Sequence, residues 1–145
     1  MKNKFLYKQE DNFIQQLDKI LKLDGNYLQA LENKCFLLWH KIIVIMELSR
    51  DEDNYQIKLT QKDSSDIFTI ITKINPIIEK ILILNPDSKL GLGSKAGVLM
   101  MEALSSEKVV ALLKLRNAIS VAKKMVHEYP DDIMSNMTLL KLYEL

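Results

Sequence analysis

The sequence is poor in residues that break helices or build covalent frameworks. It contains three prolines and four glycines, few for a protein of strands and tight turns, and this scarcity favours long helices. The single cysteine, Cys35, excludes an internal disulfide and points to a reducing compartment, so we expect a cytoplasmic protein. The length of 145 residues suits one domain, and we expect a single all-helical domain over residues 1–145.

A charge of one sign and long apolar runs are also lacking. Lys and Arg total 20 and Asp and Glu total 19, so the net charge of +1 supplies no basic surface for nucleic acid. The first residues, MKNKFLYKQED, lack the apolar stretch of a signal peptide. The longest apolar run, 36–48, is interrupted by His40, Lys41 and Glu47 and is too short to span a bilayer. We therefore expect no nucleic-acid partner and no membrane insertion.

What is present is apolar periodicity of the helical kind. Hydrophobic residues make up 48% of the chain, a globular rather than a disordered balance. The periodicity predicts six helices: 11–23, 26–48, one starting at Ser64 or Ser65, 87–104, 107–129, and one from Asp131 or Asp132 to the end. Pro76 lies inside the third, where we expect a kink or a break.

The periodicity also indicates which faces are buried. Helix 11–23 has one apolar face, made of Phe13, Leu17, Ile20 and Leu21. Helix 26–48 has two apolar stripes, which predicts packing on two sides: Leu28, Leu31, Cys35, Leu38, Ile42 and Ile45 form one, and Phe36, Trp39, Ile43 and Met46 form the other. In helix 107–129 we expect an inward set of Val109, Leu112, Leu113, Ile119, Ala122, Met125 and Val126.

The polar segment 51–62 is expected to be a loop. Tyr55, Ile57 and Leu59 alternate with polar residues there. This alternation leaves two interpretations open, because the three side chains either anchor the loop or form a short extended segment.

Three helix junctions look alike. Each has an apolar helix end, then Gly25, Pro86 or Pro130, then a short polar side chain that can cap the next helix. Six, ten and thirteen residues past the first two of these turn residues lie a large, a small and a large apolar residue: Leu31, Cys35 and Leu38, then Leu92, Ala96 and Leu99. In the third copy Asn136 stands where a large apolar residue is expected, which leaves its register open.

This pattern resembles the tetratricopeptide repeat (TPR), in which a large, a small and a large residue recur on the first helix and the second helix ends before a proline. The turn residues are 61 (86 − 25) and 44 (130 − 86) residues apart, whereas the usual repeat has about 34. The resemblance implies antiparallel helical hairpins in a TPR-like right-handed superhelix. The alternative is an irregular helical bundle built from the same hairpins.

Residues that could carry chemistry do not form a convincing site. The stretch Gly91 to Ala96 has glycines and Lys95 but lacks the spacing of a phosphate loop and a preceding strand, so we expect its glycines to permit close helix contact. His40 and His127 have no ligand spacing with a cysteine or carboxylate. We expect no metal, no cofactor and no enzymatic activity.

The TPR resemblance implies a groove lined by the first helix of each hairpin. Its positions here are Gln29, Asn33, Phe36, Trp39, His40, Leu90, Gly97, Met100, Met101, Met134, Met137 and Lys141. Aromatic and methionine side chains adapt to apolar partners, so such a groove suits an amphipathic helix or an apolar peptide. The alternative is that these residues are core, or that helix 11–23 covers them.

The expected function is therefore a non-enzymatic protein-interaction module, an adaptor or a chaperone, whose partner is a protein or peptide. In length and repeat number it resembles the translocator chaperones of type III secretion. Two alternatives stay open: an immunity or inhibitor protein that masks a partner, and a structural subunit that self-associates into a homo-oligomer.

Overall fold

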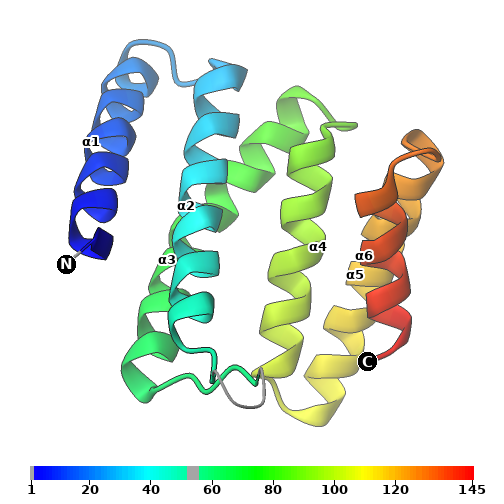
Figure 1. Ribbon diagram of the computed structural model, residues 1–145. Helices are drawn as coiled ribbons and strands as arrows, with labels where there is room; N and C mark the ends of the chain where they lie inside the picture. The colour runs from blue at the N-terminus through cyan, green and yellow to red at the C-terminus, as the bar shows by residue number, and fades with distance from the viewer. Residues whose placement is uncertain (1, 52–55) are drawn as a thin grey trace. The chain divides into compact units, whose positions relative to one another are not determined.

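The computed structural model describes residues 2–51 and 56–145, and within these ranges the protein is all-α (Figure 1). Its helices in that part of the chain are α1 (Lys2–Leu23), α2 (Leu28–Leu48), α3 (Gln61–Leu84), α4 (Lys89–Leu104), α5 (Lys108–Glu128) and α6 (Ile133–Tyr143). The all-helical prediction is confirmed. Extended pairing in the described residues is limited to one isolated antiparallel bridge between Arg50 and Ile57. Of the two interpretations of the 51–62 loop, the bridge at Ile57 favours the short extended segment. Tyr55 lies outside the described residues.

Helix α3 begins before the predicted Ser64 or Ser65, at Gln61. The reason is a reciprocal cap that the sequence analysis missed. The Asp63 backbone N–H donates to Thr60 Oγ1 at 3.1 Å, and the Thr60 N–H donates to Asp63 Oδ2 at 2.9 Å. This arrangement is a capping box with Asp in place of the usual Glu. The hydrogen bonds from Thr60 lower the pKa of the Asp63 carboxyl.

Two other predictions about helix limits can be compared with the structure, and the first is wrong. Helix α1 extends back to Lys2 instead of starting at Asp11, because the preceding residues contain no proline or glycine that would stop it. Helix α3 is continuous through Pro76, so of the predicted kink or break the break is absent. Proline removes one helical hydrogen bond, and the rest of α3 tolerates that loss.

Three turns join the helices into hairpins, and they have the same hydrogen-bond pattern. Each turn is closed by an i to i+3 bond: Tyr27 N to Asp24 O at 3.2 Å, Ser88 N to Asn85 O at 3.0 Å, and Asp132 N to Tyr129 O at 3.1 Å. The residue that begins each turn also donates back to the preceding helix, with Ile20, Ile81 and Met125 as acceptors. The last residue of each turn accepts from the next helix, with Leu31, Leu92 and Asn136 as donors. Asn136 is therefore equivalent to Leu31 and Leu92, which settles the register of the third copy.

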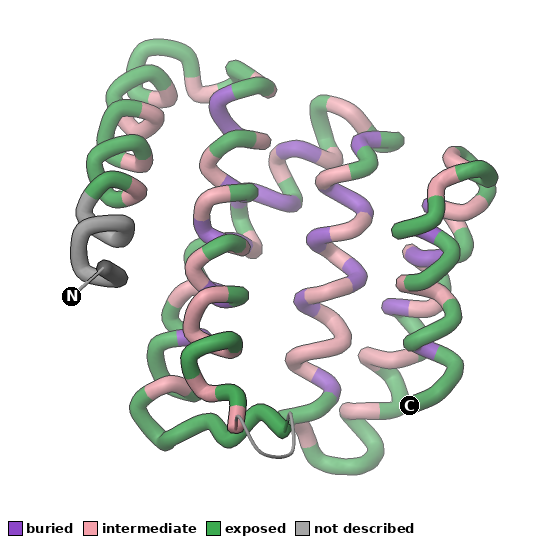
Figure 2. The backbone as a smooth tube through the Cα atoms, viewed as in Figure 1, coloured by how far each residue is buried: buried purple, intermediate pink, exposed green. Residues whose placement is uncertain are grey.

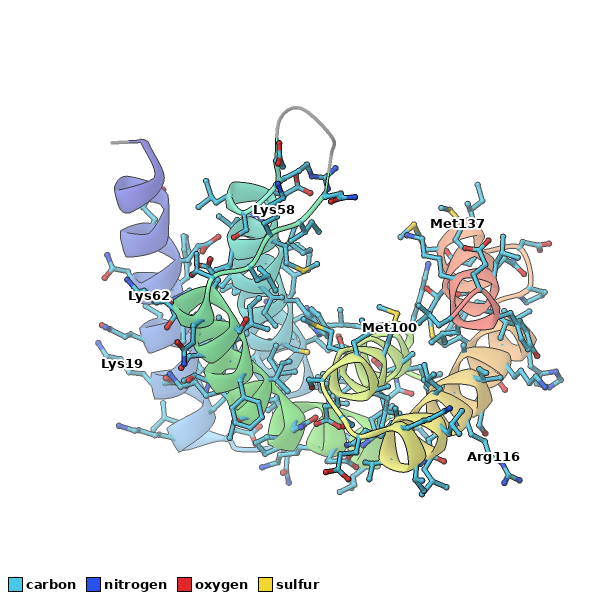
Figure 3. The ribbon with its side chains drawn as sticks, turned by 90° about the horizontal axis from the view of Figure 1, so that it is seen from below. Lys19, Lys58, Lys62, Met100, Arg116 and Met137 are labelled. Carbon is cyan, nitrogen blue, oxygen red and sulfur yellow. The ribbon has the colours of Figure 1, made fainter. Side chains whose placement is uncertain are left out.

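The chain divides into two compact units, residues 1–77 and 78–145, and each is described by itself. The expected single domain stays a prediction. In the first unit α1 packs on α2, and the N-terminal part of α3 lies beside α2 in two views (Figures 1 and 3). Asp18 pairs with Lys34 at 2.5 Å, and Asp11 pairs with Lys41. The buried apolar residues are Ala30, Leu31, Cys35, Leu38, Ile42, Ile67, Ile71, Ile74 and Ile77.

In the second unit α4 packs on α5, and α6 packs on both. Ala118, Ala122 and Leu142 form a buried cluster, against which the half-buried Leu99, Met100, Leu115, Ile119 and Leu139 pack. The end of α5 also holds the 85–88 turn, since Lys124 Nζ donates to Pro86 O at 2.7 Å and Tyr129 donates its hydroxyl to Asp87 O. These contacts make the second unit a hairpin, α5–α6, stacked on α4.

Candidate partner-binding surfaces

The second apolar stripe of α2 is largely open in this structure. Phe36 is 59% exposed and Ile43 is 51% exposed, while Trp39 and Met46 are half-buried. Most of the first stripe is buried, with only Leu28 and Ile45 half-buried, so the prediction that α2 also packs through its second stripe is wrong at Phe36 and Ile43. We call Phe36, Trp39, Ile43 and Met46 the α2 stripe. The two exposed members, Phe36 and Ile43, lie seven residues apart, about two helical turns, and so share one face of α2.

An apolar cleft of about 320 Å³ lies between α1 and α2 at one end of the α2 stripe. We call it the α1–α2 cleft. Helix α1 supplies one wall and α2 supplies the other, and the lining residues are Phe13, Gln16, Leu17, Ile20, Asn33, Phe36 and Leu37. Asn33 and Phe36, both predicted groove residues, therefore lie on the side of α2 that faces α1.

The other predicted groove residues of α2 differ in their contacts within the chain. Gln29 donates its side-chain amide to Asn33 Oδ1 at 3.2 Å. His40 Nδ1 lies 2.5 Å from Glu10 Oε1 of α1, so α1 reaches this position. Trp39 Nε1 is buried and has no hydrogen-bond partner in the described residues. Helix α1 thus reaches the groove position His40 but does not cover it, because the His40 side chain is 47% exposed.

In the second unit the predicted groove residues lie on α4 and α6. Figure 3 shows Met100 on α4 and Met137 on α6. Leu90, Gly97, Met100 and Met101 are half-buried, and Met100 packs against the Ala118 cluster. Met134 and Met137 are 65% and 44% exposed, and Lys141 is exposed. Since α4 and α6 contact each other, these helices bring part of the predicted set together on one unit.

The residues that could carry chemistry fall into structural roles. The stretch from Gly91 to Ala96 lies inside α4, and Lys95 pairs with Glu79. A helix interior does not offer the backbone N–H cradle of a phosphate loop. Cys35 is fully buried, and His127 is exposed at the end of α5. Among the described residues no group of three or more His, Cys, Asp or Glu side chains could hold a metal ion.

Sequence reasoning misplaced one apolar surface. Val109, Leu112 and Leu113 of α5 were expected to point inward, but they are 72%, 61% and 58% exposed. Of the same predicted set, Ala122 and Met125 are buried, and Ile119 and Val126 are half-buried. The helical period identifies residues that share a face, but it does not say whether another element covers that face. No signal in the sequence separates these two groups.

Comparisons with known proteins add no identity. No protein-family model matches the chain, and no curated protein sequence matches it. Of the helices in the described part of the chain, none combines the length and apolarity that a bilayer-spanning segment requires.

Proposed function

We propose that this protein is a non-enzymatic protein-interaction module, an adaptor or a chaperone of the cytoplasm, that binds an amphipathic helix or an apolar peptide of a partner protein. The observation that carries the proposal is the exposure of Phe36 and Ile43 on α2, at 59% and 51%, beside the half-buried Trp39. Trp39 lies three residues after Phe36 and four residues before Ile43. That spacing matches the i, i+3, i+4, i+7 anchors through which helices and grooves recognise each other.

The repeated turns support a TPR-like arrangement of the hairpins. Three turns with the same hydrogen bonds place equivalent residues of α2, α4 and α6 in one register. In such repeats the helix after each turn lines the binding surface, as the resemblance implies. The methionines of α4 and α6, Met101, Met134 and Met137, would extend an apolar surface of the second unit. Methionine side chains repack around different partners at low cost.

The proposal is tested by photocrosslinking from chosen positions. A photoreactive phenylalanine analogue replaces Phe36 or Ile43 in the full chain, the protein is irradiated in native lysate, and the products are sequenced by mass spectrometry. We expect the same partner from both positions, attached through a segment whose apolar residues recur at helical spacing. Phe68 of α3 is the matched control, because it is 68% exposed and lies in the same unit.

A partner captured equally well from Phe68 would show that exposure alone explains the crosslink. The charge variant Ile43→Asp should abolish capture of the partner from position 36, because a carboxylate buried in an apolar contact is strongly unfavourable. Its circular dichroism spectrum should stay unchanged. Retention of the partner by that variant would move the binding surface away from α2.

A further inference from the structure

The helices that precede the three turns can be compared position by position. Residues twelve, eight and five places before the turn residue form one stripe on each. In α3 and α5 these residues are almost entirely buried, with exposures of 0%, 0% and 0% for Ile74, Ile78 and Ile81, and of 0%, 0% and 3% for Ala118, Ala122 and Met125. In α1 the equivalent residues, Phe13, Leu17 and Ile20, form what we call the α1 stripe. Phe13 is 58% exposed and Ile20 is 40% exposed, and none of the described side chains of α1 is buried (Figure 2).

The helices that follow the turns show the reverse pattern. Residues six, ten and thirteen places after the turn residue are buried in α2, with 4%, 0% and 5% exposure for Leu31, Cys35 and Leu38. In α4, Leu92 and Ala96 are buried and Leu99 is half-buried. In α6 the equivalent residues are Asn136, Leu140 and Tyr143, which we call the α6 stripe. Asn136 is exposed, and Leu140 and Tyr143 are 61% and 58% exposed.

The contact between α4 and α5 shows how these two kinds of stripe fit each other. Leu99, thirteen places after its turn, packs against the cluster of Ala118, Ala122 and Leu142, whose two alanines lie twelve and eight places before the third turn. A Cβ at Gly93, near the start of α4, would lie 3.4 Å from Cε of Met125, near the end of α5. The two helices that carry these stripes therefore pack antiparallel. This α4–α5 contact is more extensive than that of α5 with α6 or of α1 with α2.

We propose that the α6 stripe of one copy of this protein binds the α1 stripe of a second copy, in the way that α4 binds α5. The two stripes are of the same two kinds that meet where α4 packs on α5. Neither stripe contains a charged residue, and Phe13 lines a shallow depression together with the amides Gln9, Asn12 and Gln16. The net charge of +1 per chain gives little repulsion between copies.

The equivalence of the helices also identifies the side chain of the second copy that should enter the α1–α2 cleft. Leu99 packs in a cluster that includes Leu142. Leu142 and Leu37 are equivalent residues, because each lies twelve places after its turn residue. Leu37 lines the α1–α2 cleft beside Phe13 and Leu17. The cleft thus corresponds to the space that Leu99 fills in the second unit. Tyr143, the equivalent of Leu99, is the side chain that should fill it from the second copy.

The Tyr143 ring is free enough to do so. Within its own chain the ring is contacted by Lys123, whose Nζ lies 5.9 Å from the ring centroid. This is the outer limit of a cation–π contact at an exposed site and contributes little. A buried aromatic contact with Phe13 would be worth more.

Such an interface is heterologous, because each copy uses two different surfaces. Heterologous contacts close into rings or continue as open chains rather than stopping at a symmetric dimer. We therefore expect the average mass of the protein to rise with its concentration, without a plateau at two copies unless a ring closes.

The experiment uses sedimentation velocity on the full chain and two charge variants, Phe13→Asp and Leu140→Asp. Each should weaken self-association by about tenfold or more, because each buries a carboxylate in an apolar contact. Mixed together, the two variants should form a one-to-one complex. The intact α6 stripe of Phe13→Asp can still bind the intact α1 stripe of Leu140→Asp. A contact of α1 with α1, or of α6 with α6, cannot give that result.

Phe68→Asp and Leu113→Asp are the controls, because Phe68 and Leu113 are similarly exposed, at 68% and 58%, and lie outside both stripes. Both control variants should associate like the parent protein, and so should Ile43→Asp, whose residue belongs to the proposed partner surface. A parent protein that stays monomeric at every concentration would overturn the inference. So would a dimer that survives both stripe variants, or a mixture that fails to form a complex while both variants remain folded.

Discussion

Two glycines in the same helix should respond oppositely to alanine. Gly91 and Gly93 both lie in the first half of α4, two residues apart. A Cβ at Gly91 would lie 2.8 Å from Cδ2 of Leu82 and 2.9 Å from Cγ2 of Ile81. A Cβ at Gly93 would meet only Cε of Met125, at 3.4 Å, which is an ordinary van der Waals contact. Helix α4 therefore touches the end of α3 through Gly91 but not through Gly93.

The expected magnitudes follow from two opposing effects. Replacing glycine by alanine in a helix gains about 0.5–1 kcal/mol of stability. Gly93→Ala should show that gain. Forcing a methyl group into a closed contact costs about 1–3 kcal/mol, and the contact at Gly91 includes Ile81, which is fully buried and cannot move aside. Gly91→Ala should therefore lower stability by about 1 kcal/mol, which leaves the two variants about 2 kcal/mol apart.

Urea unfolding followed by circular dichroism measures this difference, provided that the slope of the transition is the same for both variants. Each is the other's control for helix propensity. A Gly91→Ala protein as stable as the parent would refute the close helix contact. Equal losses in the two variants would mean that α4 needs flexibility rather than space.

Three further predictions follow from individual contacts. Hydrogen bonds, first from Lys89 and then from Ser135, lower the pKa of Asp132 from 3.8 to about 2. Because the pKa is lower in the folded protein, the carboxylate stabilises the fold above pH 3.8, and this contribution disappears as the pH falls through 2. In urea titrations the difference in stability between the parent and Asp132→Asn should therefore close over that pH range. Trp39→Phe should cost less than about 1 kcal/mol, because it removes a buried N–H that has no partner in the described residues; a loss above about 2 kcal/mol would reveal a hidden acceptor. Ala122→Leu should cost about 1–3 kcal/mol in thermal unfolding, because Ala122 is fully buried in the cluster with Leu142, whereas the half-buried Ala111 should accept leucine with little change.

The elements of this fold could be read from the sequence because each rests on local chemistry. Pro86 and Pro130 stop one helix, and the side chains of Ser88 and Asp132 start the next by accepting the N–H groups of Gly91 and Ser135. The start of α3 was misplaced for a related reason. Ser64 and Ser65 are good caps by residue type, but Thr60 and Asp63 satisfy each other's N–H groups, and a reciprocal pair captures the helix end before a single serine can.

Burial was harder to predict than helix formation. Leu112 and Ala122 both belong to the apolar pattern of α5, yet one is 61% exposed and the other is fully buried. The difference depends on whether α4 or α6 reaches that level of the helix, which is a tertiary fact with no local signature. The same limit applies to the predicted groove residues, since the sequence could not show that Glu10 of α1 would reach His40.

Internal repetition partly removes that limit, because it supplies a reference for burial within the same chain. The turn hydrogen bonds fix Phe13, Ile74 and Ala118 as equivalent residues. Two of the three are fully buried and one is 58% exposed. A lone exposed phenylalanine says little, because folded proteins expose many apolar atoms. Phe13 is exposed at a position that is buried in the two equivalent helices, α3 and α5. In α5 the helix that packs on this stripe is one that follows a turn, α4. Helix α6 also follows a turn, and its equivalent stripe is exposed.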